Sequence, residues 1–139
     1  MTPSLSMKLD RLRQNLALYQ KFLSVGKTML ITVQDHLRKK SFASEVTDEV
    51  DIHFRVFGED IVSRLEVSKT FDYGYIKTYR KKRNGNAIEL TPLAASLRFF
   101  REGVWSGPED TILDEYILLI VEELFESKDE SDKFFLLKQ

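Results

Sequence analysis

The chain has 139 residues, of which 42% are hydrophobic and 31% are charged, and its formal net charge is −1. This composition predicts one globular domain over residues 1–139, large enough to bury a core. Because the charges nearly cancel, the chain as a whole does not attract nucleic acid or acidic membranes, so such attraction must come from a local patch. The lack of cysteine excludes disulfides, thiolate metal sites and cysteine nucleophiles, and it favours a cytoplasmic location.

Two local charge patches stand out against this neutral background. Segment 77–83 holds five positive charges, whereas segment 109–132 holds ten carboxylates and a single lysine. The N-terminus has no charged segment followed by an apolar run, so no signal peptide is expected. The longest apolar run, 116–121, is too short to span a bilayer, so no membrane partner is expected.

A long helix reaching to about residue 40 is predicted at the start of the chain. Thr2 and Pro3 favour a helix start, because threonine caps free N–H groups and proline loses no hydrogen bond at the first position. We call the following apolar positions, which recur at alternating steps of four and three, the seam: Leu5, Leu9, Leu12, Leu16, Tyr19, Leu23, Gly26, Leu30, Val33 and Leu37. The seam is more than four heptads long. Its glycine, Gly26, predicts a kink or a close helix contact.

Four antiparallel strands are predicted after a connection without period over 42–49. They cover about 50–57, 61–71, 75–82 and 87–91, with alternating apolar and polar residues. Gly58-Glu59 favours a two-residue turn, Asp72-Tyr73-Gly74 a three-residue loop with left-handed glycine, and Asn84-Gly85 a type I′ turn. Strands joined by such short turns form a meander.

The three turns together set a register in which one face of the meander is apolar. In this register Val67 faces Tyr79, while Glu66, Arg80 and Glu89 form a charged ladder on the other face. A slip of one residue at any turn would break the agreement. The predicted buried face consists of Val50, Ile52, Phe54, Val56, Ile61, Leu65, Val67, Phe71, Tyr75, Tyr79, Ile88 and Leu90.

Two helices are predicted to complete the domain. The pair Thr91-Pro92 favours a helix start, and helical spacing predicts a short helix over about 92–102 that Gly103 caps. A longer helix is predicted over about 108–127. Residues 128–139 form a tail that is flexible unless its apolar end, Phe134–Leu137, docks on the core or on a partner. The expected fold is therefore α+β, with the helices on one face of the sheet.

The strand at 75–82 raises a nucleic-acid hypothesis, because tyrosines with interleaved lysines on an exposed sheet suit base stacking and phosphate contact. The predicted register opposes this hypothesis, since it buries both tyrosines. What remains for phosphate contact is the hairpin tip Lys81, Lys82 and Arg83. The alternative is a solvated hairpin whose charges prevent edge-to-edge aggregation.

A small-ligand hypothesis places a pocket between the sheet and the helices, lined by Lys69, Tyr75, Tyr79 and Trp105. It rests on the architecture alone. Lys69 would lie on the apolar face, where a lysine either extends to water at the rim or lines an anion-binding cleft.

The sequence predicts no catalytic, metal or cofactor site. His36 and His53 each lack a second ligand at a suitable spacing, and the carboxylates of the last helix are arranged as a solvated face. The glycines and serines match neither a phosphate-binding loop nor a nucleophile elbow. These observations favour a protein without enzymatic activity.

The leading hypothesis is therefore an interaction or regulatory protein that associates through its first helix. The seam is longer than a sheet of strands about eight residues long, roughly 27 Å, would cover. The excess length needs a protein partner, and a second copy of the chain is the simplest one.

Overall fold

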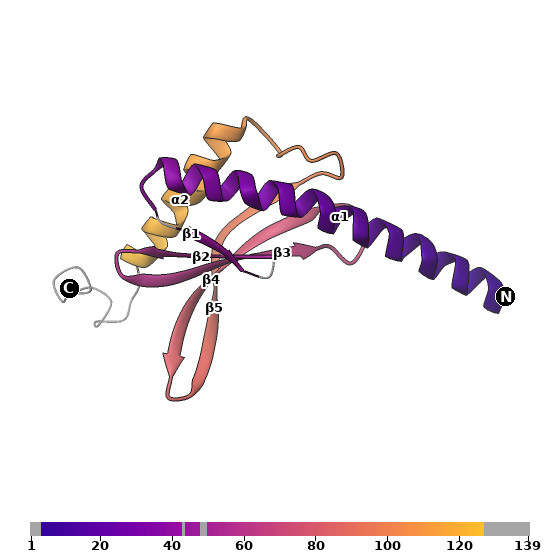
Figure 1. The fold of residues 1–139 in the computed structure, drawn as a ribbon, viewed down its shortest axis with the longest axis horizontal. Helices are drawn as coiled ribbons and strands as arrows, with labels where there is room; N and C mark the ends of the chain where they lie inside the picture. Colours follow the sequence, from indigo (N-terminus) through magenta and orange to yellow (C-terminus); the bar gives the residue numbers. More distant parts are fainter. Residues whose placement is uncertain (1–3, 43, 48–49, 127–139) are drawn as a thin grey trace.

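The computed structural model describes residues 4–42, 44–47 and 50–126. In this part of the chain, a five-stranded antiparallel sheet in the order β1-β2-β3-β4-β5 is covered on one face by α1 (Leu5–Lys39) and α2 (Glu109–Phe125) (Figure 1). The strands are β1 (Ser44–Thr47), β2 (Asp51–Val56), β3 (Glu59–Val67), β4 (Gly74–Asn84) and β5 (Ala87–Phe99). The predicted α+β class, with both helices on one face, is confirmed. The strand β1 lies within the segment expected to be a connection.

The long helix α1 begins with Ser4 as its cap, whose Oγ accepts a hydrogen bond from the Met7 N–H at 3.2 Å. Thr2 and Pro3, on which the predicted start depended, lie outside the described residues, as does the tail at 128–139. The helix ends where it was predicted to end, and basic residues in its last turn suit the negative end of the helix dipole.

The turn between β2 and β3 is Phe57–Gly58, one residue earlier than predicted. Both residues have positive φ, 51° and 80°, as a type I′ turn requires. Ile61 consequently faces Phe54, whereas the predicted register placed it opposite Val56. This is a shift of two residues, and because strand side chains alternate, it leaves the same residues of both strands in the core.

The loop between β3 and β4 is longer than the predicted three residues, and it changes the register by an odd number. Val67 faces Gly74, the first residue of β4, instead of Tyr79. The loop is closed by Ser68, whose Oγ accepts hydrogen bonds from the N–H groups of Asp72 and Tyr73 at 3.1 and 3.2 Å.

An odd shift exchanges the two faces of β4. Ile76 and Thr78 are buried under the helices, and Tyr75 and Tyr79 lie on the opposite face. The prediction that these tyrosines belong to the core is therefore wrong. The reason is Gly74, which is not the left-handed residue of a turn: a Cβ there would lie 2.1 Å from the Phe99 ring, so β4 needs glycine where that ring packs.

Strand β5 occupies the segment where a short helix was predicted at 92–102. It is an edge strand, so Pro92 removes no N–H that the sheet needs. The register of β4 and β5 shifts near Thr78, and there the Glu123 carboxylate of α2 accepts the N–H groups of Ala94 and Ala95 at 2.8 and 2.9 Å. The hairpin turn lies one residue later than predicted, and Ile88, expected in the core, is exposed.

The core lies between the sheet and the two helices. The helices contribute Phe22, Met29, Leu30, Val33, Leu37, Leu113, Tyr116, Ile120 and Leu124. Tyr116 is fully buried, and its hydroxyl shares hydrogen bonds with Ser63 and, at 2.6 Å, with Thr78. Burial raises the pKa of Tyr116 to about 12, although these hydrogen bonds work in the opposite direction. Gly26 makes a close contact with a strand and not with another helix, because a Cβ there would lie 2.5 Å from Leu65 Cδ1 of β3.

Candidate functional site

The first half of α1 extends beyond the sheet and beyond α2 (Figure 1). The buried residues of the helix begin at Phe22, and we call the preceding part, residues 5–21, the α1 arm. In the arm the seam continues without a covering element, and its side chains are 43–74% exposed: Leu5, Leu9, Leu12, Leu16 and Tyr19. The predicted excess length of the helix is thus present, and it exposes a heptad-spaced apolar stripe.

A second uncovered surface is the face of β4 that points away from the helices. Because side chains alternate along a strand, every second residue of β4 lies on this face, with successive side chains about 6.6–6.8 Å apart. We call these residues the β4 stripe: Tyr75, Lys77, Tyr79, Lys81 and Arg83. The stripe therefore alternates rings and cations near the sheet and ends in two cations on the β4–β5 hairpin, which projects below the sheet in Figure 1.

Cations lie over the aromatic rings of this face. Lys77 Nζ is 5.6 Å from the centre of the Tyr75 ring, and the guanidinium carbon of Arg64 is 5.9 Å from the centre of the Tyr79 ring. The Arg98 guanidinium is closer still, at 4.6 Å from the Tyr73 ring. Positive charge and ring faces are thus brought together at the same places on the sheet.

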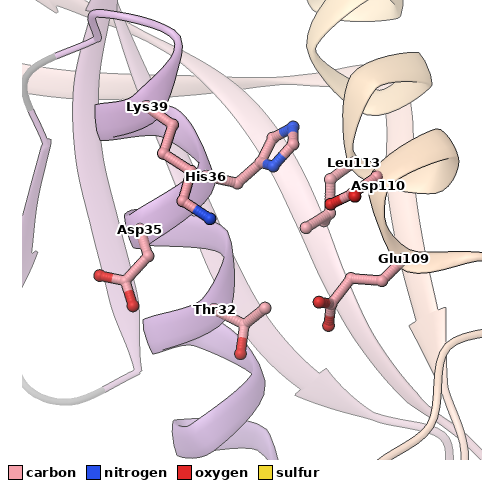
Figure 2. Close-up of a pocket in the computed structure, with 7 residues that line it drawn as sticks. All are labelled: Thr32, Asp35, His36, Lys39, Glu109, Asp110 and Leu113. Carbon is pink, nitrogen blue, oxygen red and sulfur yellow. The ribbon is translucent and has the colours of Figure 1, made fainter.

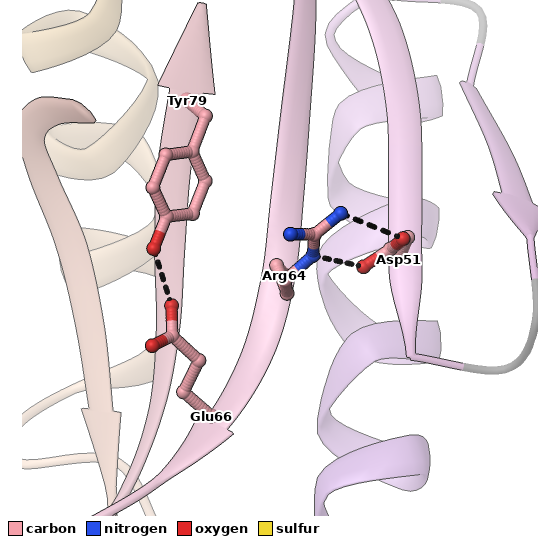
Figure 3. A network of polar contacts seen from close by, with 4 residues as sticks. All are labelled: Asp51, Arg64, Glu66 and Tyr79. Atoms are coloured by element: carbon pink, nitrogen blue, oxygen red, sulfur yellow. Dashed lines mark hydrogen bonds and ion pairs between the residues drawn. The ribbon is translucent and has the colours of Figure 1, made fainter. Parts of the chain in front are cut away.

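Two carboxylates on this face already have partners, as Figure 3 shows. The Tyr79 hydroxyl donates a hydrogen bond to Glu66 Oε2 at 2.6 Å, and Asp51 accepts hydrogen bonds from Arg64 at 3.0 and 3.4 Å. The hydrogen bond to Glu66, with burial as a second cause, raises the pKa of Tyr79. The hydrogen bond with Asp51 likewise raises the pKa of Arg64, against the opposing effect of burial.

The cations of the stripe are not neutralised in this way. Within residues 4–42, 44–47 and 50–126, no carboxylate forms an ion pair with Lys77, Lys81 or Arg83. The residues of the predicted basic tip do not share one face. Lys81 and Arg83 belong to the stripe, whereas Lys82 lies on the other side of the hairpin, opposite Glu89.

The predicted outer ladder of Glu66, Arg80 and Glu89 is wrong. Arg80 belongs to the face of β4 that the helices cover, where its guanidinium pairs with Glu59 at 3.0 Å in a largely buried ion pair. Glu89 lies on the hairpin, where it accepts a hydrogen bond from Asn84 at 3.3 Å.

The four residues predicted to line a ligand pocket do not lie together. Trp105 is buried on the helix side of the sheet, where its ring packs against Phe99 and its Nε1 donates to Glu109 at 2.9 Å. Tyr75 and Tyr79 lie on the other side, and Lys69 is exposed in the loop between β3 and β4.

A cavity of about 200 Å³ lies between the two helices (Figure 2). It is lined by Thr32, Asp35, His36, Lys39, Glu109, Asp110 and Leu113. His36 is buried, points from α1 toward α2, and its Nε2 donates to Asp114 Oδ1 at 2.8 Å. This hydrogen bond is the main cause that lowers the pKa of Asp114, and Lys40 adds to the effect. The pair ties the two helices together.

Sequence reasoning missed the tie between His36 and Asp114 because the two residues are 78 positions apart and no motif joins them. In the described part of the chain, no group of three histidine, aspartate or glutamate side chains is arranged to hold a metal ion. The cavity is therefore a small polar recess beside the hydrogen bond that joins the two helices.

The described surface thus offers two features that no neighbouring element covers, the α1 arm and the β4 stripe. Neither α1 nor α2 combines the length and the apolarity of a membrane-spanning helix. Comparison of the chain with protein-family models, with curated proteins and with solved structures found no match.

Proposed function

We propose that this is a non-enzymatic interaction protein that pairs with a second copy of itself through the α1 arm. The supporting observation is the heptad-spaced stripe of five apolar side chains, 43–74% exposed, on a helix whose other half is packed into the core. Such a stripe is best covered by another of the same spacing, whose side chains fit between its own. A second copy supplies this matching stripe.

The position of the sheet favours one direction of the proposed pairing. The buried seam residues Leu30, Val33 and Leu37 face the sheet, so the sheet lies on the seam side of the helix beyond Phe22. In a parallel pair, both sheets would have to fit between two helices only about 8–10 Å apart. In an antiparallel pair the two sheets lie at opposite ends, and only the arms overlap. We therefore propose an antiparallel pair.

An antiparallel pair centred near Gln14 places each exposed seam residue opposite a seam residue of the second copy. Leu12 lies opposite Leu16, and Leu9 lies opposite Tyr19. The first of the exposed residues, Leu5, then meets Leu23 at the edge of the second copy's core.

The charges of the arm also favour this direction. A parallel pair would place Lys8 of each copy beside Arg13 of the other, which gives two repulsive contacts. The antiparallel pair leaves one, between the two Arg13 side chains. Because the arm carries four positive residues and one negative residue, screening by salt should strengthen the pairing.

The expected affinity is modest. Burying a half-exposed leucine contributes roughly 1 kcal/mol, so ten such side chains in a pair contribute roughly 10 kcal/mol. Association costs at least about 4 kcal/mol in lost freedom of motion. The remaining free energy of about 6 kcal/mol corresponds to a dissociation constant of tens of micromolar.

Sedimentation over a range of protein concentrations tests the pairing. The native chain should pass reversibly from monomer to dimer near this dissociation constant, and the double variant Leu12→Glu, Leu16→Glu should stay monomeric. The matched control is Ile31→Glu with Leu118→Glu, which adds the same charge at side chains of similar exposure outside the arm. A native chain that is monomeric at several times this dissociation constant would refute self-association.

Disulfide formation tests the direction, and the chain has no cysteine of its own to interfere. The single variants Leu9→Cys and Tyr19→Cys should form a mixed disulfide when combined. Leu9→Cys alone should not cross-link, because its two copies in the antiparallel pair lie roughly 15 Å apart along the helix axis, beyond disulfide reach. Efficient cross-linking of Leu9→Cys alone would instead indicate a parallel pair.

A further inference from the structure

The face of the sheet opposite the helices combines features that the pairing of the α1 arm does not use. The stripe residues Tyr75, Lys77, Tyr79, Lys81 and Arg83 lie on one face of β4, from its second residue to the part that belongs to the β4–β5 hairpin. This hairpin projects from the sheet in Figure 1. From the first to the last of them the strand spans roughly 26 Å. An extended chain molecule would lie along this surface more readily than a compact ligand.

The net charge of this face is positive. Its carboxylates Asp51 and Glu66 are engaged with Arg64 and Tyr79. A third carboxylate, Asp60, lies opposite Lys81 and is engaged with Arg55 at 2.9 Å. The stripe adds three cations that form no ion pair with a carboxylate of the described ranges, and Arg98 of β5, opposite Tyr75, adds a fourth. An extended molecule with regularly spaced negative charges complements such a row.

The aromatic rings distinguish a nucleic acid from other polyanions. The rings of Tyr73, Tyr75 and Tyr79 each have a cation 4.6–5.9 Å from the ring centre. A base can stack on the ring face while the neighbouring cation contacts a phosphate. In a duplex the base faces are occupied by stacking within the helix, so this combination favours unpaired bases.

We infer that the β4 stripe, with Tyr73 and Arg98 beside it, is a binding surface for single-stranded nucleic acid. The lysines and arginines contact phosphates, and the tyrosines stack on bases without reading a sequence. The surface lies on the opposite side of the sheet from the helices, so it is available in the monomer and independent of pairing through the α1 arm. The sequence opposed this function because it predicted both tyrosines in the core. The observed register of β4 places them on the face opposite the helices instead.

Fluorescence anisotropy with labelled oligo(dT) and oligo(U) tests the surface. The native chain should bind both at low salt, and four phosphate contacts predict that log K falls with log salt with a slope of about −3. The variant Lys77→Gln, Lys81→Gln should bind at least about tenfold more weakly, since each cation lost removes a phosphate contact. The matched control, Lys69→Gln with Lys82→Gln, removes the same charge from positions outside the stripe and should bind like the native chain.

The rings are tested separately with Tyr75→Leu, Tyr79→Leu, which keeps the charge and an apolar surface. This variant should bind single strands about tenfold more weakly, as expected for the loss of base stacking. Binding of a duplex of the same length, which cannot stack on the rings, should not change. Both measurements are made in the Leu12→Glu, Leu16→Glu background as well, so that a failure of pairing does not affect the result.

Several results would overturn this inference. They are absence of binding at low salt, equal losses in the stripe variant and its matched control, and unchanged single-strand binding when the tyrosines are replaced. Binding to anionic phospholipid vesicles that depends on the lysines but not on the tyrosines would assign the surface to a membrane instead. A melting curve of each variant verifies that it folds.

Discussion

The two halves of α1 carry the same seam in opposite surroundings. In the second half, Leu30 and Val33 are 0% and 1% exposed, because the sheet lies against them. In the arm, Leu12 and Leu16 are 53% and 50% exposed. The second half of the helix is thus packed against the rest of the domain, which we call the body. The arm carries the same apolar residues, but no other part of the chain packs against them. One continuous stripe thus packs within the chain along half of its length, and along the other half it is left for the proposed partner.

The largest expected effect is on the free energy of unfolding, when leucine is replaced by alanine in each half of the helix. Leu30→Ala should lower the free energy of unfolding by about 2–5 kcal/mol, because it leaves a cavity under the sheet. Leu12→Ala should change it by no more than about 0.5 kcal/mol when the protein is dilute and monomeric. Urea unfolding at low protein concentration measures both. Equal losses would mean that the arm is packed within one chain.

A polar contact gives a second comparison between body and arm. Tyr116→Phe removes the hydroxyl that bonds to the buried Thr78 and Ser63, and should cost about 1–3 kcal/mol of stability because those hydroxyl groups lose their partner. The same change at Tyr19, in the arm, should have almost no effect. Thermal and urea unfolding of the two variants provide the test, and a neutral Tyr116→Phe would contradict the buried network.

Gly26 lies near the boundary between the halves. Gly26→Ala should lower stability by about 1 kcal/mol, because crowding against Leu65, typically about 1–3 kcal/mol, exceeds the helix-propensity gain of about 1 kcal/mol. Ser24→Ala, on the exposed side of the same turn, is the control and should be neutral or slightly stabilising. A stabilised Gly26→Ala would show that the sheet begins to cover the helix later than Gly26.

The smallest expected effect is a dependence on acid. The hydrogen bond from His36 lowers the pKa of Asp114, so the folded state favours the ionised carboxylate. This contribution to stability is present above the ordinary pKa of aspartate and is lost as the pH falls through the lowered value in the folded state. Asp114→Asn should therefore flatten the decline of the melting temperature below about pH 4. Asp10→Asn, in the arm, should leave that decline unchanged.

Much of the body could be predicted from the sequence because local patterns determine it. The alternation of apolar and polar residues predicts the inner faces of β2 and β3. These faces are correct despite the misplaced turn, because the resulting register error is two residues, an even number. The prediction of the inner face of β4 is wrong, because the ring of Phe99, distant in the sequence, requires glycine at position 74, and a turn does not. Thr91-Pro92 predicts a helix start, because nothing in its neighbourhood distinguishes an edge strand from the first turn of a helix.

The candidate surfaces were predictable to different degrees. The exposed part of the seam could be predicted from residue counts, because a helix of that length is longer than the strands of the sheet. The rings and cations of the β4 stripe were also visible, but their common face depended on the register that Gly74 and Ser68 set. The tie between His36 and Asp114 depends on how the two helices pack and has no local signal.

Hydrogen exchange along α1 tests the central claim most directly. In a dilute solution of monomers, backbone amides of residues 22–39 should exchange slowly, and amides of the arm should exchange fast because no element covers them. At protein concentrations well above the expected dissociation constant, the arm should become protected while the second half stays as it was. An arm that is equally protected at both concentrations, or equally unprotected at both, would contradict the account.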